Sequence, residues 1–370
     1  MESLRILIMN YMDAKHPGAG GSEVFTQEVA RRWVKLGHEV TLMCAKFNGA
    51  MDRDEIDGVE VLRSGGRYTV YLKAKKVYEK IFKGKIDIAI DEINTIPFFT
   101  PRYLKEPKIA LIHQLAREIL FYELPLPVAT LGYFLELRML RTYNEIPIVT
   151  VSKSSKDSLI DAGIPAKNIH IVSQGIDHEC YKPSKDKRND PLIAYVGWLK
   201  KYKRVNDLLK SIKYVAKQLP EVKLMLASKS KGKSIAELKR WITKLALQDN
   251  VVFLGPISKM EKLVLLSHVQ VLVYTSVREG FGLPILEGAA CRTPAIAYDV
   301  PGLRDAVLNG ITGLLTPYRD VKALANAITK ILTDEALRKS LSENAYKWSF
   351  NFSWDKTATQ FMDLIKKYTY

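Results

Sequence analysis

Short apolar runs alternate along the chain with longer segments in which apolar residues recur every three or four positions. The short runs are typical of strands buried on both faces, and the longer segments are typical of amphipathic helices. The first run, Arg5–Met9, precedes a helical pattern that we expect Ser22 to cap and Gly37 to end. Strand, helix and strand in series predict a parallel sheet covered on both faces.

The same alternation runs through both halves of the chain. In the first half, the further expected strands are Val40–Cys44, Val59–Leu62, Ile86–Ile90, Ile109–Ile112, Ile148–Val151 and Ile169–Val172. In the second half, they are Leu192–Val196, Val222–Leu226, Val251–Leu254, Val269–Tyr274 and Pro294–Tyr298. The helices expected in the second half are Val205–Leu219, Ile235–Leu247, Lys259–Ser267, Val321–Thr333, Glu335–Trp348 and Ser353–Tyr368.

The rhythm breaks near Ile176–Pro191, where the chain is polar and carries two prolines. We therefore predict an N-terminal Rossmann-like domain over 1–180, a linker over 181–191 and a C-terminal Rossmann-like domain over 192–350. The last helix, in 351–370, is expected to pack back on the first domain. The predicted fold class is α/β, with two doubly wound domains facing each other across a cleft, and ligands bind beyond the carboxyl ends of such strands.

Composition indicates the class of protein, its cellular compartment and the charge of its partners. Hydrophobic residues make up 47% of the chain and charged residues 26%, which is typical of a folded globular protein. Three scattered cysteines favour a reducing compartment, and neither a secretory leader nor a membrane-spanning run is visible, so we expect a cytoplasmic protein. The net charge of +16 favours an anionic partner or simply keeps the surface solvated.

A glycine-rich loop follows the first strand. Gly18, Gly20 and Gly21 lie between Arg5–Met9 and the first helix, where backbone without Cβ atoms can approach a phosphate. The dinucleotide fingerprint G-x-G-x-x-G fails, because its last glycine position holds Glu23. The loop therefore indicates either phosphate or substrate contact, or a plain turn.

The strongest pattern is Glu279-Gly-Phe-Gly-Leu-Pro-Ile-Leu-Glu287, which follows the predicted strand Val269–Tyr274. Pro284 fits the first turn of a helix, and the helix start near Leu283 offers free N–H groups to a diphosphate. Glu279 lies before the helix and Glu287 about one turn inside it. Two carboxylates on either side of an anion-binding turn suit a molecule with a sugar at each end of a diphosphate. The alternative is two solvated surface acids.

Several motifs together resemble the retaining glycosyltransferases of family 4, the glycosyl transferases of group 1, which have the GT-B fold. The motifs extend over nearly the whole chain. They are Gly20-Gly21-Ser22-Glu23, Val151-Ser152, Gly175-Ile-Asp177, Val196-Gly197-Trp198-Leu199 with Lys203, Glu279-x7-Glu287, Tyr298-Asp-Val-Pro-Gly-Leu-Arg-Asp305 and Asn309-Gly-Ile-Thr-Gly313. The resemblance implies transfer of a hexose from a GDP- or UDP-linked donor to a glycan or lipid-linked acceptor, with retention of configuration.

The resemblance also implies residue roles. Glu287 binds the ribose hydroxyls, Glu279 binds hydroxyls of the transferred sugar, and Lys203 with Arg204 neutralises the diphosphate. His113, at the end of a predicted strand, contacts the donor sugar. The remaining expected contacts to the nucleotide-sugar come from Gly20, Gly21, Gly280, Phe281, Gly282 and Leu283.

Three departures from the family pattern stand out. Trp198 occupies a position where the family often has Arg, Leu226–Ser230 replaces a usual Gly-x-Gly turn, and Ser173-Gln174-Gly175 replaces Asn-Gly.

Cations and N–H groups aimed at the leaving phosphate supply charge stabilisation without a metal, so we expect neither a metal nor another cofactor. No covalent nucleophile stands out, and a front-face displacement is our hypothesis for retention.

The acceptor side is less determined. Arg67–Lys85 mixes Lys with apolar residues, which predicts either a basic helix on an anionic membrane or core packing with a solvated face. Glu118–Phe134 suggests a substrate-covering loop or a membrane-facing lip. Peripheral contact with the inner face of an anionic membrane is therefore one expected partnership. The rival functions are a GT-B sugar-nucleotide epimerase or phosphorylase and a basic protein that binds membrane or nucleic acid surfaces; we expect no nucleic-acid partner, because no recognition motif is present.

Overall fold

The computed structural model describes residues 3–184 and 190–370, and the chain divides into two compact α/β units. Unit 1 comprises Met1–Arg117, Leu126–Gly175 and Ser353–Tyr370, and unit 2 comprises Glu118–Pro125 and Ile176–Phe352. Part of the expected linker, residues 185–189, lies outside the described residues. The structure confirms an α/β protein built from two Rossmann-like parallel sheets.

Unit 1 is built on an eight-stranded sheet. Its strands, in spatial order, are β3 (Arg53–Ile56), β4 (Val59–Arg63), β2 (Glu39–Cys44), β1 (Arg5–Met9), β5 (Ile88–Glu92), β6 (Lys108–Leu111), β7 (Ile148–Thr150) and β8 (Ile169–Ile171). Among the described strands of this sheet, β3 alone runs antiparallel to its neighbour. The apolar pattern did not predict β3, because its sequence RDEI is polar and it forms the edge of the sheet.

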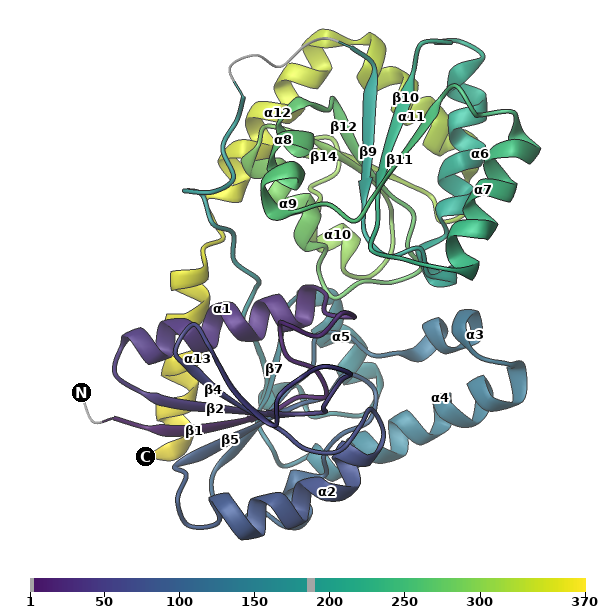
Figure 1. Cartoon of the computed structure of the whole chain (residues 1–370). Coiled ribbons are helices and arrows are strands. Elements are labelled where there is room, and N and C mark those ends of the chain that lie inside the picture. Colours follow the sequence, from purple (N-terminus) through teal and green to yellow (C-terminus); the bar gives the residue numbers. More distant parts are fainter. Residues whose placement is uncertain (1–2, 185–189) are drawn as a thin grey trace. The chain divides into compact units, whose positions relative to one another are not determined.

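The helices of unit 1 cover this sheet (Figure 1). They are α1 (Gly21–Lys35), α2 (Thr69–Val77), α4 (Leu126–Leu140), α5 (Lys153–Asp161) and α13 (Trp354–Thr369). The expectation that Ser22 caps α1 is wrong: Gly20 is the N-cap residue, and the Glu23 side chain accepts a hydrogen bond from the Gly20 N–H at 2.7 Å. Gly37 follows the end of α1 with a φ of +91°, as a C-terminal glycine does.

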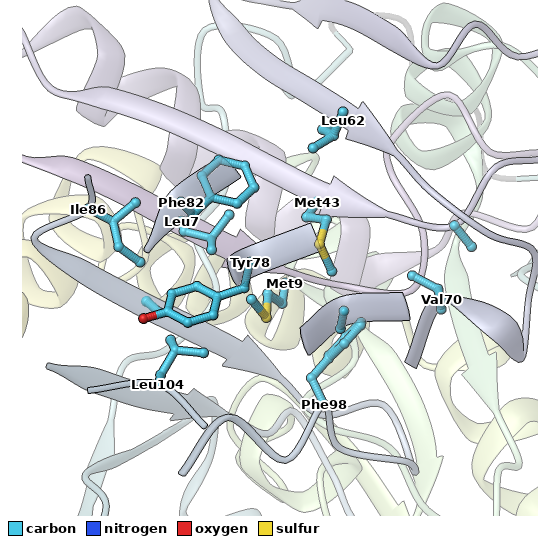
Figure 2. Packing of buried hydrophobic residues seen from close by; sticks show 13 residues of the cluster. Leu7, Met9, Met43, Leu62, Val70, Tyr78, Phe82, Ile86, Phe98 and Leu104 are labelled. Atoms are coloured by element: carbon cyan, nitrogen blue, oxygen red, sulfur yellow. The ribbon is translucent and has the colours of Figure 1, made fainter. Parts of the chain in front are cut away.

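The apolar side of the basic segment Arg67–Lys85 lies in the core of unit 1. Figure 2 shows Tyr78 and Phe82, from the π-helical turn Tyr78–Phe82, near Met9 and Leu7 of β1, and Val70 of α2 belongs to the same cluster. These side chains are therefore not available to a membrane. Core packing accounts for these side chains, whereas Tyr68 and Leu72 of the same segment are exposed.

The segment Glu118–Phe134 is helical rather than a loop. It contains the short helix α3 (Leu120–Glu123) and most of α4, in which Pro127 occupies the first turn, where its missing N–H costs nothing. The apolar side chains of α4 that are exposed are Leu126, Val128, Leu131, Phe134 and Leu135. Within residues 3–184 and 190–370, no helix combines the length and apolar character needed to span a bilayer.

The C-terminal helix α13 packs against α1 within unit 1 (Figure 1). The indole N–H of Trp33 donates to the Ala358 carbonyl at 3.0 Å, and the rings of Trp33 and Phe361 meet edge to face with centroids 5.2 Å apart. The backbone of Gly175 passes so close to α13 that a Cβ there would lie 2.3 Å from the Trp354 nitrogen. The end of the chain is thus part of the N-terminal core.

Unit 2 is built on a six-stranded parallel sheet. Its strands, in spatial order, are β11 (Val251–Gly255), β10 (Lys223–Ala227), β9 (Leu192–Val196), β12 (Val271–Tyr274), β13 (Ala295–Tyr298) and β14 (Gly313–Thr316). Its helices are α6 (Val205–Ala216), α7 (Lys233–Leu245), α8 (Lys259–His268), α9 (Leu283–Ala290), α10 (Leu303–Ala306), α11 (Val321–Thr333) and α12 (Glu335–Ser349). Strand β14, with the sequence GLLT, was not predicted.

Each sheet reverses its strand order once near its centre. In unit 1 the reversal falls between β1 and β5, and in unit 2 between β9 and β12. Connections leave such a pair of strands in opposite directions, which opens a crevice at the carboxyl edge of the sheet where ligands bind in this class of fold. The loops after these strands are therefore where candidate site residues are to be sought.

Candidate active site

Lys203 and Glu279 form an ion pair at the carboxyl edge of the sheet of unit 2. The Lys203 ammonium donates to Glu279 Oε1, which also accepts from the Ser276 hydroxyl at 2.5 Å. Burial alone would lower the pKa of Lys203, but the Glu279 carboxylate, with smaller effects from Tyr202 and Tyr195, raises it overall. Lys203 is therefore a fixed cation at the strand-order reversal.

Backbone contacts tie the loops that carry these two residues together. The Thr275 hydroxyl donates to the Lys203 carbonyl at 2.9 Å, and the Val277 N–H donates to the Tyr202 carbonyl at 2.9 Å. The first loop follows β9 and the second follows β12, so neighbouring strands deliver both to the same edge. This arrangement fixes Lys203 beside Glu279 before any ligand arrives.

Gly302 supports the backbone of Glu279. The Glu279 N–H donates to the Pro301 carbonyl at 3.1 Å, and a Cβ at Gly302 would lie 2.0 Å from the Glu279 carbonyl oxygen. Gly302 also has a φ of +84°, which side-chain-bearing residues rarely adopt. The Pro-Gly motif at 301–302 thus positions the acidic residue of another loop.

The turn before α9 presents backbone rather than side chains. Gly282 is the N-cap residue of α9 and has a φ of +112°. Pro284, in the first turn, has no N–H, so that position leaves no backbone donor without a partner. Phe281 and Leu283 are buried, and the Phe281 ring packs edge to face on Phe352 with centroids 5.4 Å apart. Any ligand contact from residues 280–283 would therefore come from their main chain, at the positive end of the helix.

Glu287 is buried on α9 with one oxygen engaged and the other free. Its Oε1 accepts from the Tyr181 hydroxyl at 2.7 Å and from the Lys262 ammonium at 2.5 Å. Its Oε2 is buried, and no described residue hydrogen-bonds to it. Burial, and then the Glu287 carboxylate, raise the pKa of Tyr181, so its hydroxyl remains a donor. An unpaired buried carboxylate oxygen is costly and marks a place where a ligand hydroxyl fits.

Arg204 has partners that differ from those of Lys203. It caps α6 in the left-handed region, with a φ of +49°, and its Nε donates to Asp207 at 2.7 Å. Its guanidinium lies 5.9 Å from the ring centroids of both Tyr122 and Tyr318, whose hydroxyls hydrogen-bond to each other at 2.7 Å. Any contribution to phosphate binding would come from the other guanidinium nitrogens.

In unit 1, the loop after β1 is organised by a buried acid. Glu23 accepts from the Gly20 N–H and, at 2.9 Å, from the Ser22 hydroxyl. Burial and the neighbouring Glu92 carboxylate raise the pKa of Glu23. A Cβ at Gly21 would meet no described atom within 4 Å, so this glycine faces open space. The loop is therefore pre-shaped, with its glycine backbone accessible.

His113 follows β6 and lies against the last residue of β5. Its Nε2 is 3.2 Å from Oε1 of the buried Glu92, and Glu92 Oε2 accepts from the Thr26 hydroxyl at 2.5 Å. The Phe25 ring meets the imidazole edge to face with centroids 5.0 Å apart. The structure thus joins His113 to the first helix through an acid that the sequence pattern did not single out.

The expected site residues fall into separate groups. Lys203 and Glu279 are in contact, Glu287 belongs to a network with Tyr181 and Lys262, and Arg204 pairs with Asp207. Sequence reasoning missed Tyr181, Lys262 and Glu92. Only Glu92 carried a usable signal, since it is an acid two residues after the predicted strand Ile86–Ile90.

No metal site accompanies these groups in the part of the chain that the structure describes. Among residues 3–184 and 190–370, no three His, Cys, Asp or Glu side chains gather so as to hold a metal ion. Metal independence nevertheless stays a prediction, to be tested with chelator.

Comparisons with known proteins agree with this geometry. The model of the glycosyl transferases group 1 matches residues 178–348, and that of glycosyltransferase family 4 matches residues 19–179. The first match contains Lys203, Glu279 and Glu287, and the second contains Gly20 and His113. The chain belongs to the group 1 family of glycosyltransferases.

Relatives of this chain are diverse. It is 26% identical over 239 residues to the capsular polysaccharide biosynthesis glycosyltransferase CapM of Staphylococcus aureus, a match that covers 60% of this chain and 62% of CapM. The fold resembles sucrose-phosphate synthase from Thermosynechococcus elongatus, with a TM-score of 0.83, 22% identity and 98% of both chains covered. It also resembles Anabaena Alr3699/HepE in complex with UDP and glucose, with a TM-score of 0.79, 19% identity, and 98% and 100% covered. These structures confirm the GT-B fold.

Proposed function

We propose that this group 1 glycosyltransferase moves a sugar from a nucleoside diphosphate to an acceptor hydroxyl with retention of anomeric configuration. The observation that carries the proposal is the Lys203–Glu279 ion pair at the strand-order reversal of unit 2, beside the N-terminus of α9. The donor pairs a dianionic diphosphate with a polyhydroxylated sugar. A fixed cation and a hydrogen-bond acceptor side by side suit those two parts.

Glu287 is the proposed ribose ligand. Its buried Oε2 without a described partner can accept a ribose hydroxyl, while Tyr181 and Lys262 hold Oε1 in place. The HepE structure contains UDP. That neighbour supports a UDP-sugar as the first donor to try, with GDP-sugars second.

Departure of the diphosphate is the step that the cations assist. The bond from the anomeric carbon to the phosphate oxygen breaks, negative charge builds on the diphosphate, and Lys203 with the N–H groups of Gly282 and Leu283 stabilises it. The acceptor oxygen then bonds to the same face of the sugar, and its proton passes to the departing phosphate. Gly20 and Gly21 are proposed to approach the phosphates, and His113 the transferred sugar.

The acceptor site proposed for unit 1 is a cavity of about 830 Å³ beyond β2 and β4. Lys46 and Lys73 line it together with Gly65 and Gly66. Lys46 pairs with the exposed Asp52, whereas Lys73 has no ion-pair partner among the described residues. This lining favours a hydroxylated acceptor that also carries an anionic group, as lipid-linked and phosphorylated glycans do.

Peripheral membrane contact is proposed through α4 rather than through α2. The exposed apolar side chains of α4 and the net charge of +16 together suit an anionic bilayer surface. Sedimentation with vesicles of anionic and of neutral lipid tests this. Binding to neither kind of vesicle would remove the membrane from the proposal.

The proposed function is tested by donor screening followed by turnover. UDP-, GDP-, ADP- and dTDP-sugars are compared by thermal shift, because a ligand raises the melting temperature by mass action. Release of nucleoside diphosphate is then measured with and without acceptor lipids or glycans. An epimerase would convert the sugar without releasing nucleotide, a phosphorylase would need phosphate, and a basic binding protein would show salt-sensitive binding without turnover.

A further inference from the structure

Glu92 and His113 form a buried pair whose geometry defines the state of the imidazole. His113 Nε2 lies 3.2 Å from Glu92 Oε1, and the two side chains are 8% and 0% exposed. The second oxygen of Glu92 accepts from Thr26 on α1. Both carboxylate oxygens are therefore engaged, one by the ring and one by a hydroxyl.

A carboxylate accepts hydrogen bonds and donates none, so the proton of a neutral His113 ring belongs on Nε2. The other nitrogen, Nδ1, then carries a lone pair. It is buried, and no described residue hydrogen-bonds to it. A buried acceptor without a partner is the kind of atom that a ligand donor completes.

The surrounding structure prevents the ring from reorienting freely. Phe25 packs on the imidazole from α1, and the Ser155 hydroxyl of α5 donates to the His113 carbonyl at 2.8 Å. Residues of α1 and α5 thus hold His113 in place, and the contact with Glu92 directs Nε2 toward β5.

We propose that Glu92 is a positioning residue that keeps His113 in the Nε2–H form, so that Nδ1 accepts a hydrogen bond from a hydroxyl of the transferred sugar. This inference rests on the proposed function. It assigns a specificity, because the sugar must carry a hydroxyl at the carbon nearest Nδ1. A deoxy analogue would leave Nδ1 without a donor, and a carboxylate there would place a second acceptor against its lone pair.

The tautomer is measured directly in the unliganded enzyme. Long-range ¹H–¹⁵N correlation spectra of ¹⁵N-histidine-labelled protein, assigned with His113→Asn, distinguish Nε2–H from Nδ1–H rings. We expect the Nε2–H form in the wild type and a mixture in Glu92→Gln, because an amide can present either its oxygen or its NH₂ group. An Nδ1–H ring in the wild type would overturn the proposal, whether or not the variant folds.

Kinetics test the consequence for the sugar. Glu92→Gln is expected to lower kcat about 10- to 100-fold on the proposed donor, with an unchanged Kd for UDP. Glu60→Gln, an exposed acid on β4 of the same sheet, is the matched control and is expected to behave as the wild type. In a His113→Phe background, Glu92→Gln should have little further effect, since the residue acts through the ring.

The outcomes separate this inference from the proposed function. If the wild type turns over no nucleotide-sugar, the proposed function fails, and the tautomer measurement still decides the role of Glu92. If the wild type turns over and Glu92→Gln matches it in kcat, the positioning role alone is wrong. His113→Asn offers a rescue, since its amide oxygen is as many bonds from Cα as Nδ1 is, and it should retain more activity than His113→Phe.

Discussion

Lys203 and Glu279 are 76 positions apart in the sequence, yet the ammonium of one donates to the carboxylate of the other, and each side chain is only 14% exposed. The pair needs no ligand to form. The ammonium and the carboxylate are therefore already in place where the diphosphate and the hydroxyls of a nucleotide-sugar would bind. On donor binding, each would replace its contact with the other by a contact with the donor, and neither would have to be ordered from solvent.

Replacing Lys203 with Gln should lower kcat about 10²- to 10³-fold, the usual effect of removing one preorganised donor to developing negative charge. Steady-state release of nucleoside diphosphate measures it. Lys201→Gln, in the same short turn, is the control and should keep near-normal turnover. A fully active Lys203→Gln enzyme would contradict the assigned role.

The pH dependence of this cation follows from the direction of its shift. Folding raises the pKa of Lys203, so the stability that its charge contributes is fully present below the unfolded value of about 10.5 and is lost only as pH rises through the higher folded value. We expect no alkaline loss of kcat caused by Lys203 between pH 7 and 10. A pH–rate profile checks this, and a decline that disappears in Lys203→Arg would argue against it.

Glu287→Gln should weaken donor binding about tenfold or more. The amide presents an NH₂ group where Oε1 now accepts from Tyr181 and Lys262, or where a ribose hydroxyl would donate to Oε2. Calorimetric titration with UDP gives the Kd. Tyr181→Phe is the companion variant, because it removes a donor to Oε1 and leaves Oε2 intact, and it should cost less affinity.

Gly302→Ala should abolish most activity, because its Cβ would lie 2.0 Å from the Glu279 carbonyl oxygen and displace that loop. Gly310→Ala is a matched control: it also has positive φ, +73°, but its Cβ would meet no described atom within 4 Å. The control carries only the strain of the left-handed region, about 1 kcal/mol. Comparable activity in the two variants would show that the close contact is unimportant.

Phe361→Ala should destabilise unit 1 by about 3–5 kcal/mol, the range for removing a buried aromatic side chain. The ring is 1% exposed and packs on Trp33 and Phe25. Urea unfolding followed by the Trp33 signal, in a protein with its other tryptophans replaced by Phe, reports on this unit. Tyr370→Ala, at a side chain that is 76% exposed, should leave the midpoint unchanged.

Much of the fold followed from the alternation of apolar runs with helical patterns. Strand Leu192–Val196 and helix Val321–Thr333 were predicted to the residue, because buried parallel strands and amphipathic helices have distinct periods. Two elements, β3 and α4, were not predicted, because their sequences lack the usual strand and helix patterns. Polar edge strand β3 has no apolar run, and α4 follows Pro125 and holds Pro127 in its first turn, so its start has the composition of a loop.

Contacts between candidate site residues were predictable only where the residues follow neighbouring strands. Lys203 and Glu279 follow strands that pair in the sheet, so their proximity could be anticipated from topology. Lys262 and Tyr181 could not be found this way: one lies in the middle of a helix and the other in an irregular segment. Their contact with Glu287 depends on packing that no local pattern encodes.

The position of α13 also bears on how the chain is made. Synthesis proceeds from the N-terminus, so the residues that cover Trp33 and Phe25 emerge only after all of unit 2. The apolar side of α1 that packs on α13 therefore stays uncovered until α13 has been synthesised. A truncation within α13 would thus destabilise the unit whose first strands and helices are synthesised earliest.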